Sequence, residues 1–203
     1  MNKAVLLALP LLAAAPLLAQ NGAPQLPGQA DPSRVAAGTY AVDNHHAQIQ
    51  WTVSHFGFND YFGIFGQPTG SLTIDPAKPN DAKLSITIPV NELATSRGDL
   101  TKHMLTADFL DATKYPTAKF ESTKVEASGT KAKITGNLTL LGVTKPVVLD
   151  AQFTGAGTNP MSQKATIGFH GSTTLKRSDW GMTKYAPFIS DDVRINISIA
   201  FEK

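Results

Sequence analysis

The 203-residue chain contains no cysteine. This absence excludes disulfide bonds, a thiolate nucleophile, cysteine-ligated metals and lipid attachment to a cysteine. The formal net charge is only +2, and Lys and Arg form no dense run, so the sequence offers no basic patch of the kind that binds nucleic acid. We therefore expect no nucleic-acid partner, and a stability that comes from an apolar core and a hydrogen-bonded sheet.

The short motifs of common enzyme classes are also missing. The sequence has no Gly-x-Ser-x-Gly elbow, no phosphate-binding loop ending in Gly-Lys-Ser/Thr and no His-Glu-x-x-His pair. The five histidines are scattered, and the adjacent His45 and His46 would point to opposite faces of a strand. We predict no metal site and no cofactor. Gly155-Ala156-Gly157 lacks the third glycine and the helix of a dinucleotide site, and residues 155–160 are interpreted as a loop.

The N-terminal residues have the pattern of a secretory signal. Lys3 supplies the positive charge, and the apolar stretch after it, residues 4–18, is shorter than the roughly 20 residues that span a bilayer. We predict a signal peptide over residues 1–19 and export to the periplasm, with an uncleaved anchor as the alternative. Residues 20–38 are rich in Pro, Gly, Gln and Ala and predict a flexible leader. One folded domain should then occupy residues 39–203.

Most of this domain alternates apolar and polar residues, as half-buried strands do. Between Gln48 and Phe56, the odd-numbered residues from Ile49 to His55 share one face. Similar alternation predicts strands over residues 70–74, 83–89, 118–125, 132–140, 147–153, 165–175 and 193–201. Roughly eight strands with short connections favour an all-β fold, an antiparallel eight-stranded barrel, with a β-sandwich as the alternative. Alternation does not distinguish a hollow barrel from a filled one.

The alternation stops between Asn91 and Phe120. Asp99 and Asp108 stand where helix N-caps would stand, and Tyr115-Pro116 would end a helical segment. Three apolar residues share one helical stripe: Leu93, Leu100 and Met104. The pattern predicts one or two short helices that cross between two groups of strands and cover one end of the barrel.

Aromatic residues and glycines are interleaved between Gly57 and Gly66. Aromatic side chains at this density seldom face water without a reason. Two interpretations stay open: a hairpin whose rings fill the core, or an aromatic mouth that contacts an apolar ligand or a membrane surface.

Several motifs together resemble one known family, the YceI-like proteins. The most specific is the run Gly136-Asn137-Leu138-Thr139-Leu140 followed by Gly142-Val143-Thr144-Lys145-Pro146-Val147. The others include Lys102-His103-Met104, Ala107-Asp108-Phe109-Leu110-Asp111 and Arg177-Ser178-Asp179-Trp180-Gly181. The likeness extends from about Tyr40 to Glu202. It implies a lipocalin-like barrel with a long apolar tunnel that binds polyisoprenoid chains, such as quinone tails or isoprenoid alcohols and phosphates, in the periplasm. One departure is that Leu100-Thr101 stand where relatives often carry an Arg-Asp pair.

We therefore expect a non-enzymatic carrier or store of an isoprenoid lipid. The candidate ligand-binding residues are Trp51, His55, Phe58, Phe62, Leu100, His103, Met104, Phe109, Phe120 and Trp180. His55 and His103 would lie near the head group. Two alternatives are an enzyme acting on a lipid-like molecule, with His55 or His103 as general base, and a solidly packed barrel that binds another protein. A homodimer and a transient contact with a membrane surface stay open.

Overall fold

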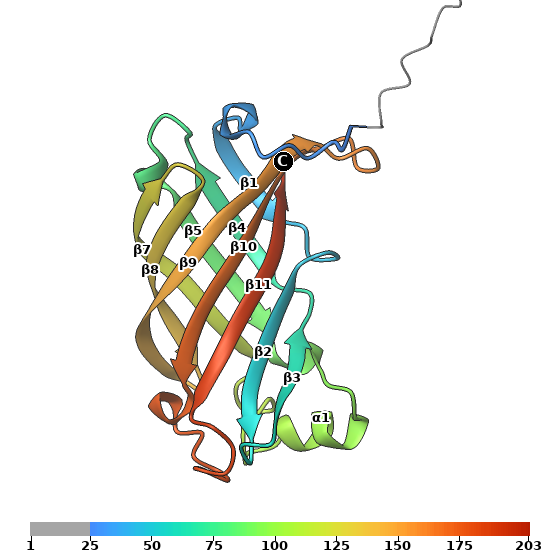
Figure 1. The fold of residues 1–203 in the computed structure, drawn as a ribbon, viewed down its shortest axis with the longest axis vertical. Helices are drawn as coiled ribbons and strands as arrows, with labels where there is room; N and C mark the ends of the chain where they lie inside the picture. The colour runs from blue at the N-terminus through green and yellow to red at the C-terminus, as the bar shows by residue number, and fades with distance from the viewer. Residues whose placement is uncertain (1–24) are drawn as a thin grey trace, which may run out of the picture.

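A computed structural model describes residues 25–203 (Figure 1). The predicted signal peptide, residues 1–19, lies outside the described residues. The strands are β1 (Gly38–Val42), β2 (Gln48–His55), β3 (Asn59–Phe65), β4 (Thr69–Ile74), β5 (Lys83–Pro89), β6 (Leu93–Ala94), β7 (Thr117–Ser128), β8 (Lys131–Leu140), β9 (Val143–Thr158), β10 (Ala165–Lys176) and β11 (Asp192–Glu202). The helical elements are α1 (Gly98–Met104) and the 3-10 turns η1 (Pro32–Arg34), η2 (Pro79–Asp81), η3 (Val90–Glu92) and η4 (Arg177–Trp180).

Eight strands form a closed ring in which every neighbouring pair is antiparallel. Their order is β1-β4-β5-β7-β8-β9-β10-β11, and β1 pairs again with β11 through Ala41 opposite Glu202 and Val42 opposite Phe201. The expected antiparallel eight-stranded barrel is confirmed. Each stretch expected to be a strand is one, and β7 and β9 extend beyond their expected ends. Closure matters because a closed sheet leaves no long row of unpaired backbone groups in the ring.

Three further strands, β2, β3 and β6, complete the barrel wall at the end where β11 no longer pairs with β1. The last residues of β11 pair with β1, whereas its earlier part, Arg194–Ser198, pairs with β2. β3 then pairs with β2, and the short β6 pairs with β3. Figure 1 shows α1 beside β3 at the end of the barrel opposite the C-terminus, which we call the lower end. The helical crossing therefore lies at one end of the barrel, as the sequence predicts.

The details of this crossing differ from the sequence prediction. The segment holds one α-helix, α1, whose N-cap is Arg97, and Asp99 lies inside its first turn. Asp108 caps no second helix, because the chain after α1 folds into turns in which the Leu110 N–H donates to the Met104 carbonyl and the Asp111 N–H to that of Thr106. Among residues 25–203, no helix is both long and apolar enough to cross a membrane.

The described part of the predicted leader packs on the upper end of the barrel. β9 extends past β8, whose first residue Lys131 pairs with Gln152, so the end of β9 presents a free edge on that side. Gln29 pairs with this edge by donating to and accepting from Ala156, at 3.0 and 2.8 Å. The loop predicted over residues 155–160 is wrong for residues 155–158, because this edge pairing and the pairing with β10 hold them in β9.

A glycine is required where the N-terminal segment crosses β9. A Cβ at Gly157 would lie 2.0 Å from the Pro27 carbonyl oxygen, whereas a Cβ at Gly66 would meet nothing within 4 Å. We predict that Gly157→Ala displaces the segment and speeds hydrogen exchange of the Gln29 amide at least about tenfold, because its bond to Ala156 is lost. Gly66→Ala is the matched control. An unchanged exchange rate at Gln29 in Gly157→Ala would contradict this account.

Candidate functional site

The barrel encloses an interior cavity of about 1090 Å³. This exceeds the common range of small-molecule pockets, which is about 300–1,000 Å³. Its lining extends from η1 and the β7–β8 turn at the upper end to α1 and the β2–β3 turn at the lower end. The side chains that point inward therefore do not fill the barrel, and the interior is hollow.

The inward faces of the strands make this cavity almost wholly apolar. The odd-numbered residues of β11 from Val193 to Phe201 line it, as do those of β2 from Ile49 to His55. One transverse row is made of unusually small residues, Ala132, Ala151 and Gly171, which lie opposite one another on β8, β9 and β10. All three line the cavity, and their small side chains occupy little of the space inside the wall there.

Most of the candidate residues lie around this one space. The structure brings eight of them to the cavity wall: Trp51, His55, Leu100, His103, Met104, Phe109, Phe120 and Trp180. They come from β2, α1, the turns after α1, β7 and η4, which are far apart in the sequence. Leu100, His103 and Met104 are presented by α1 at the lower end.

The other two candidates, Phe58 and Phe62, lie outside the cavity lining. Phe58 sits in the turn between β2 and β3 and is 89% exposed; Phe62 is 58% exposed on the outer face of β3. The register explains Phe62, because Trp51 lies opposite Gly63 and paired residues share a face. The inward residues of β3 are therefore Tyr61 and Phe65, which sequence reasoning passed over although the alternation with β2 could have indicated them.

Polar side chains gather at the lower end. His103 Nε2 lies 3.2 Å from Asp108 Oδ2, and Lys184 Nζ lies 3.2 Å from the same carboxylate. These hydrogen bonds, that of His103 first, hold the pKa of the Asp108 carboxyl below its ordinary value. A hydrogen bond from Arg97 likewise lowers the pKa of Asp99. Both of these carboxylates, Asp99 and Asp108, therefore have a cationic partner.

Arg177 is a buried cation that sequence reasoning did not assign. Its guanidinium donates to three carbonyl oxygens, those of Ser190 at 2.9 Å, Met182 at 2.7 Å and Ile189 at 3.0 Å. Burial lowers its pKa. These contacts fasten the loop between η4 and β11 to the barrel. In the sequence, Arg177 stood out only as the first residue of the Arg177–Gly181 family motif.

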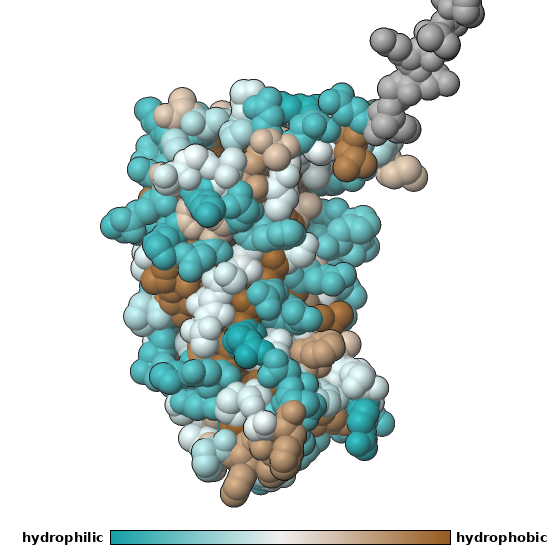
Figure 2. Space-filling model, in the orientation of Figure 1, coloured by the Kyte–Doolittle hydropathy of each residue, from teal (hydrophilic) through white to brown (hydrophobic). Residues whose placement is uncertain are grey.

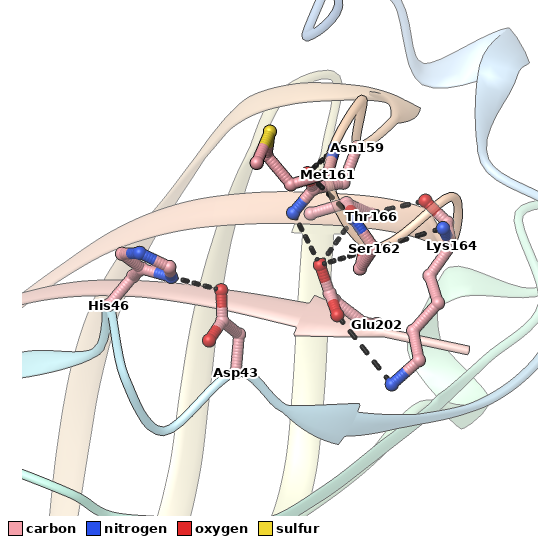
Figure 3. Close-up of polar contacts among 8 residues, drawn as sticks. All are labelled: Asp43, His46, Asn159, Met161, Ser162, Lys164, Thr166 and Glu202. Carbon is pink, nitrogen blue, oxygen red and sulfur yellow. Dashed lines mark hydrogen bonds and ion pairs between the residues drawn. The ribbon is translucent and has the colours of Figure 1, made fainter.

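A polar cluster on the upper end serves the fold (Figure 3). The Glu202 carboxylate accepts hydrogen bonds from Asn159 at 2.7 Å, Ser162 at 3.0 Å and Thr166 at 3.1 Å, which tie the β9–β10 loop to the end of β11. Nearby, His46 Nδ1 lies 2.7 Å from an Asp43 carboxylate oxygen. In the part of the chain that the structure describes, no three metal-binding side chains converge.

Fold and site together define a hollow antiparallel β-barrel with an apolar interior and paired charges at one mouth. The family model of the YceI-like domain matches residues 40–201, and the chain belongs to this family. A UPF0312 protein from Pseudomonas aeruginosa strain LESB58 is 40% identical over 165 residues, covering 80% of this chain and 86% of the relative. One from Pseudomonas putida strain W619 is 42% identical over 149 residues, 72% and 77% of the two chains.

Solved structures share the same barrel. The YceI protein of Campylobacter jejuni is 31% identical, with a TM-score of 0.66 over 74% of this chain and 89% of the other. BcnA of Burkholderia cenocepacia is 24% identical, with a TM-score of 0.70 over 78% and 98%. A polyisoprenoid binding domain from Saccharophagus degradans, 14% identical, has a TM-score of 0.60 over 82% and 99%. The last two likenesses concern the fold alone.

The Asp108 contacts generate a pH prediction. The carboxyl of Asp108, followed by NMR, should titrate below the ordinary Asp value of about 3.9, and His103→Ala and Lys184→Ala should each raise its midpoint. Because the folded-state pKa is lowered, these contacts stabilise the fold above about pH 3.9, and this contribution is lost as the pH falls through the lowered pKa.

Lys102→Ala is the matched control for this titration, because Lys102 lies beside His103 on α1 and is no ion-pair partner of Asp108 among the described residues. An Asp108 carboxyl that titrates at the ordinary value in the unmodified protein would show that neither contact persists in solution.

Proposed function

We propose that this protein binds an isoprenoid lipid, of the quinone or polyprenyl type, in its apolar cavity and stores or carries it in the periplasm. The observation that carries the proposal is a hollow barrel with a cavity of about 1090 Å³ whose wall is mostly apolar. The polyisoprenoid binding domain from Saccharophagus degradans, which has the same fold, supports the same ligand class. The signal-like N-terminal residues support the location.

The physical basis of binding is burial of apolar surface. A tail that removes roughly 400 Å² from water would gain about 10 kcal/mol at about 25 cal/mol per Å², before the costs of association. No catalytic group is needed for tight binding. The polar groups at the lower end, His55 and His103 among them, would lie near the head group, and the tail would extend toward the row of Ala132, Ala151 and Gly171.

The proposal makes the protein a binder without chemistry of its own. His103 is engaged by the carboxylate of Asp108 at 3.2 Å, and His55 packs by its ring against Phe56, with ring centroids 4.7 Å apart. These contacts give both histidines a role in shaping the mouth. The enzyme alternative has no comparable observation in its favour.

Intrinsic fluorescence provides a direct test, because the only two tryptophans of the sequence, Trp51 and Trp180, both line the cavity. Organic extraction of the purified protein followed by mass spectrometry should recover an isoprenoid. Added long-tailed ubiquinone should quench tryptophan emission and raise the melting temperature, since a ligand that binds only the folded chain stabilises it. Neither an isoprenoid in the extract nor any response to quinone or polyprenyl phosphate would reject the proposal.

The row of small residues predicts how tail length is selected. Ala151→Phe should fill space in the tunnel at this row and weaken binding of a long-tailed ubiquinone at least about tenfold, while a short-tailed one is affected less. Val148→Phe is the matched control, because Val148 is exposed on the outside of the same strand. Equal losses for long and short tails would mean that the tail does not reach this row.

A further inference from the structure

The exposed aromatic residues of the described chain are concentrated at the lower end. Four of them form what we call the aromatic rim: Phe56, Phe58, Tyr185 and Phe188, which are 51%, 89%, 49% and 62% exposed. Two come from the turn between β2 and β3, and two from the loop between η4 and β11. Figure 2 shows apolar side chains gathered over this lower tip of the molecule.

The two loops of the rim are held together. The Phe56 N–H donates to the Phe188 carbonyl at 2.7 Å, and the two rings stack with centroids 5.6 Å apart. The second loop is fastened to the barrel by the three hydrogen bonds of Arg177. The rings are therefore ordered on the surface by contacts behind them.

The backbone presents these rings at a conformational cost. Phe56 and Tyr185 have φ values of 53° and 60°, a left-handed conformation that residues other than glycine seldom adopt. Such strain persists where the surrounding structure imposes it, and it often marks functional surfaces. Here it combines with the exposure of large apolar rings to water, so the unbound protein carries two unfavourable features at the same place.

The rim is continuous with the cavity. Phe56 and Tyr185 belong both to the exposed rim and to the cavity lining, and Phe58 and Phe188 extend farther outward. An apolar chain that left the cavity at this mouth into water would lose the free energy gained by burying each of its CH₂ groups. A rim seated in a lipid surface would remove that exposure, because the chain would pass from one apolar environment to another.

Charge at the mouth favours a neutral or zwitterionic surface. Arg97 pairs with Asp99, Lys184 pairs with Asp108, and Arg194 pairs with Asp60. Each of these three cations is therefore neutralised by a carboxylate and adds nothing to a basic patch that would attract an anionic bilayer. The rings, rather than a basic patch, would supply the binding energy.

We propose that the aromatic rim docks the barrel on a lipid bilayer, with its rings seated at the boundary between head groups and acyl chains. The inference rests on the proposed function for its purpose, which is transfer of the apolar ligand without passage through water. Docking itself requires no bound ligand, so the two are tested separately.

The test is flotation of delipidated protein with phosphatidylcholine vesicles. The unmodified protein should float with the vesicles, and a double variant, Phe58→Ser with Phe188→Ser, should reduce the bound fraction at least about tenfold. Phe62→Ser is the matched control, because Phe62 is about as exposed as Phe188, at 58% against 62%, but lies on the outer wall of β3. Melting temperatures of all variants establish that they are folded.

A second measurement reports how deeply the rim enters the bilayer. In vesicles of brominated phosphatidylcholine, the bromine atoms should quench the fluorescence of the tryptophan introduced by Phe58→Trp. The tryptophan introduced by Phe62→Trp should not be quenched. Unmodified protein that stays with the bulk solution, or a double variant that floats like it, would overturn the proposal. Flotation that requires anionic lipid and is lost at high salt would also overturn it. So would a protein that does not bind vesicles but forms a dimer through the rim, a dimer that the double variant no longer forms. None of these outcomes affects quinone binding, which the fluorescence titration measures independently.

Discussion

Closure of the sheet between β1 and β11 is the constraint on which the remaining structure depends. It is made by two residue pairs at the end of β11, Ala41 with Glu202 and Val42 with Phe201, while the rest of β11 pairs with β2. The edge of β11 that faces away from β10 thus pairs with two strands. The upper part becomes a complete ring, and the lower part is completed by β2, β3, β6 and the crossing that carries α1. A complete wall is what turns inward apolar faces into an enclosed space.

The enclosed space is mostly apolar, and polar groups that could contact a ligand gather at its lower mouth. Asp108 near the lower mouth is paired with His103 and Lys184, and the buried Arg177 is satisfied by backbone carbonyls. Burying polar groups is tolerated when they are hydrogen-bonded, which these are. The wall therefore recognises a ligand by apolar contact, and the lower mouth is the place where a polar head and a lipid surface would both be met.

Much of this arrangement follows from alternation along the sequence. The inward residues of β11 and β2 can be assigned from every second position, and the structure places Trp51, His55 and Val193 where that rule puts them. The candidate Phe62 lies on the outer face of β3, because the register with β2 turns Tyr61 inward instead. The rule could not place Arg177, whose partners are carbonyls in a loop with no periodicity, or Gly157, whose need for space arises from the distant Pro27.

The sequence by itself indicated the fold class and the inward faces of strands such as β2 and β11, because side chains alternate across a strand with a fixed period of two. Its short motifs indicated the family. Only the tertiary structure decided that the barrel is hollow. A filled core and a tunnel share the same alternation, and the difference depends on how far apart the opposing walls stand and where small residues such as Ala132, Ala151 and Gly171 come together. Those positions are brought into one row by pairing between strands, which no local stretch of sequence records.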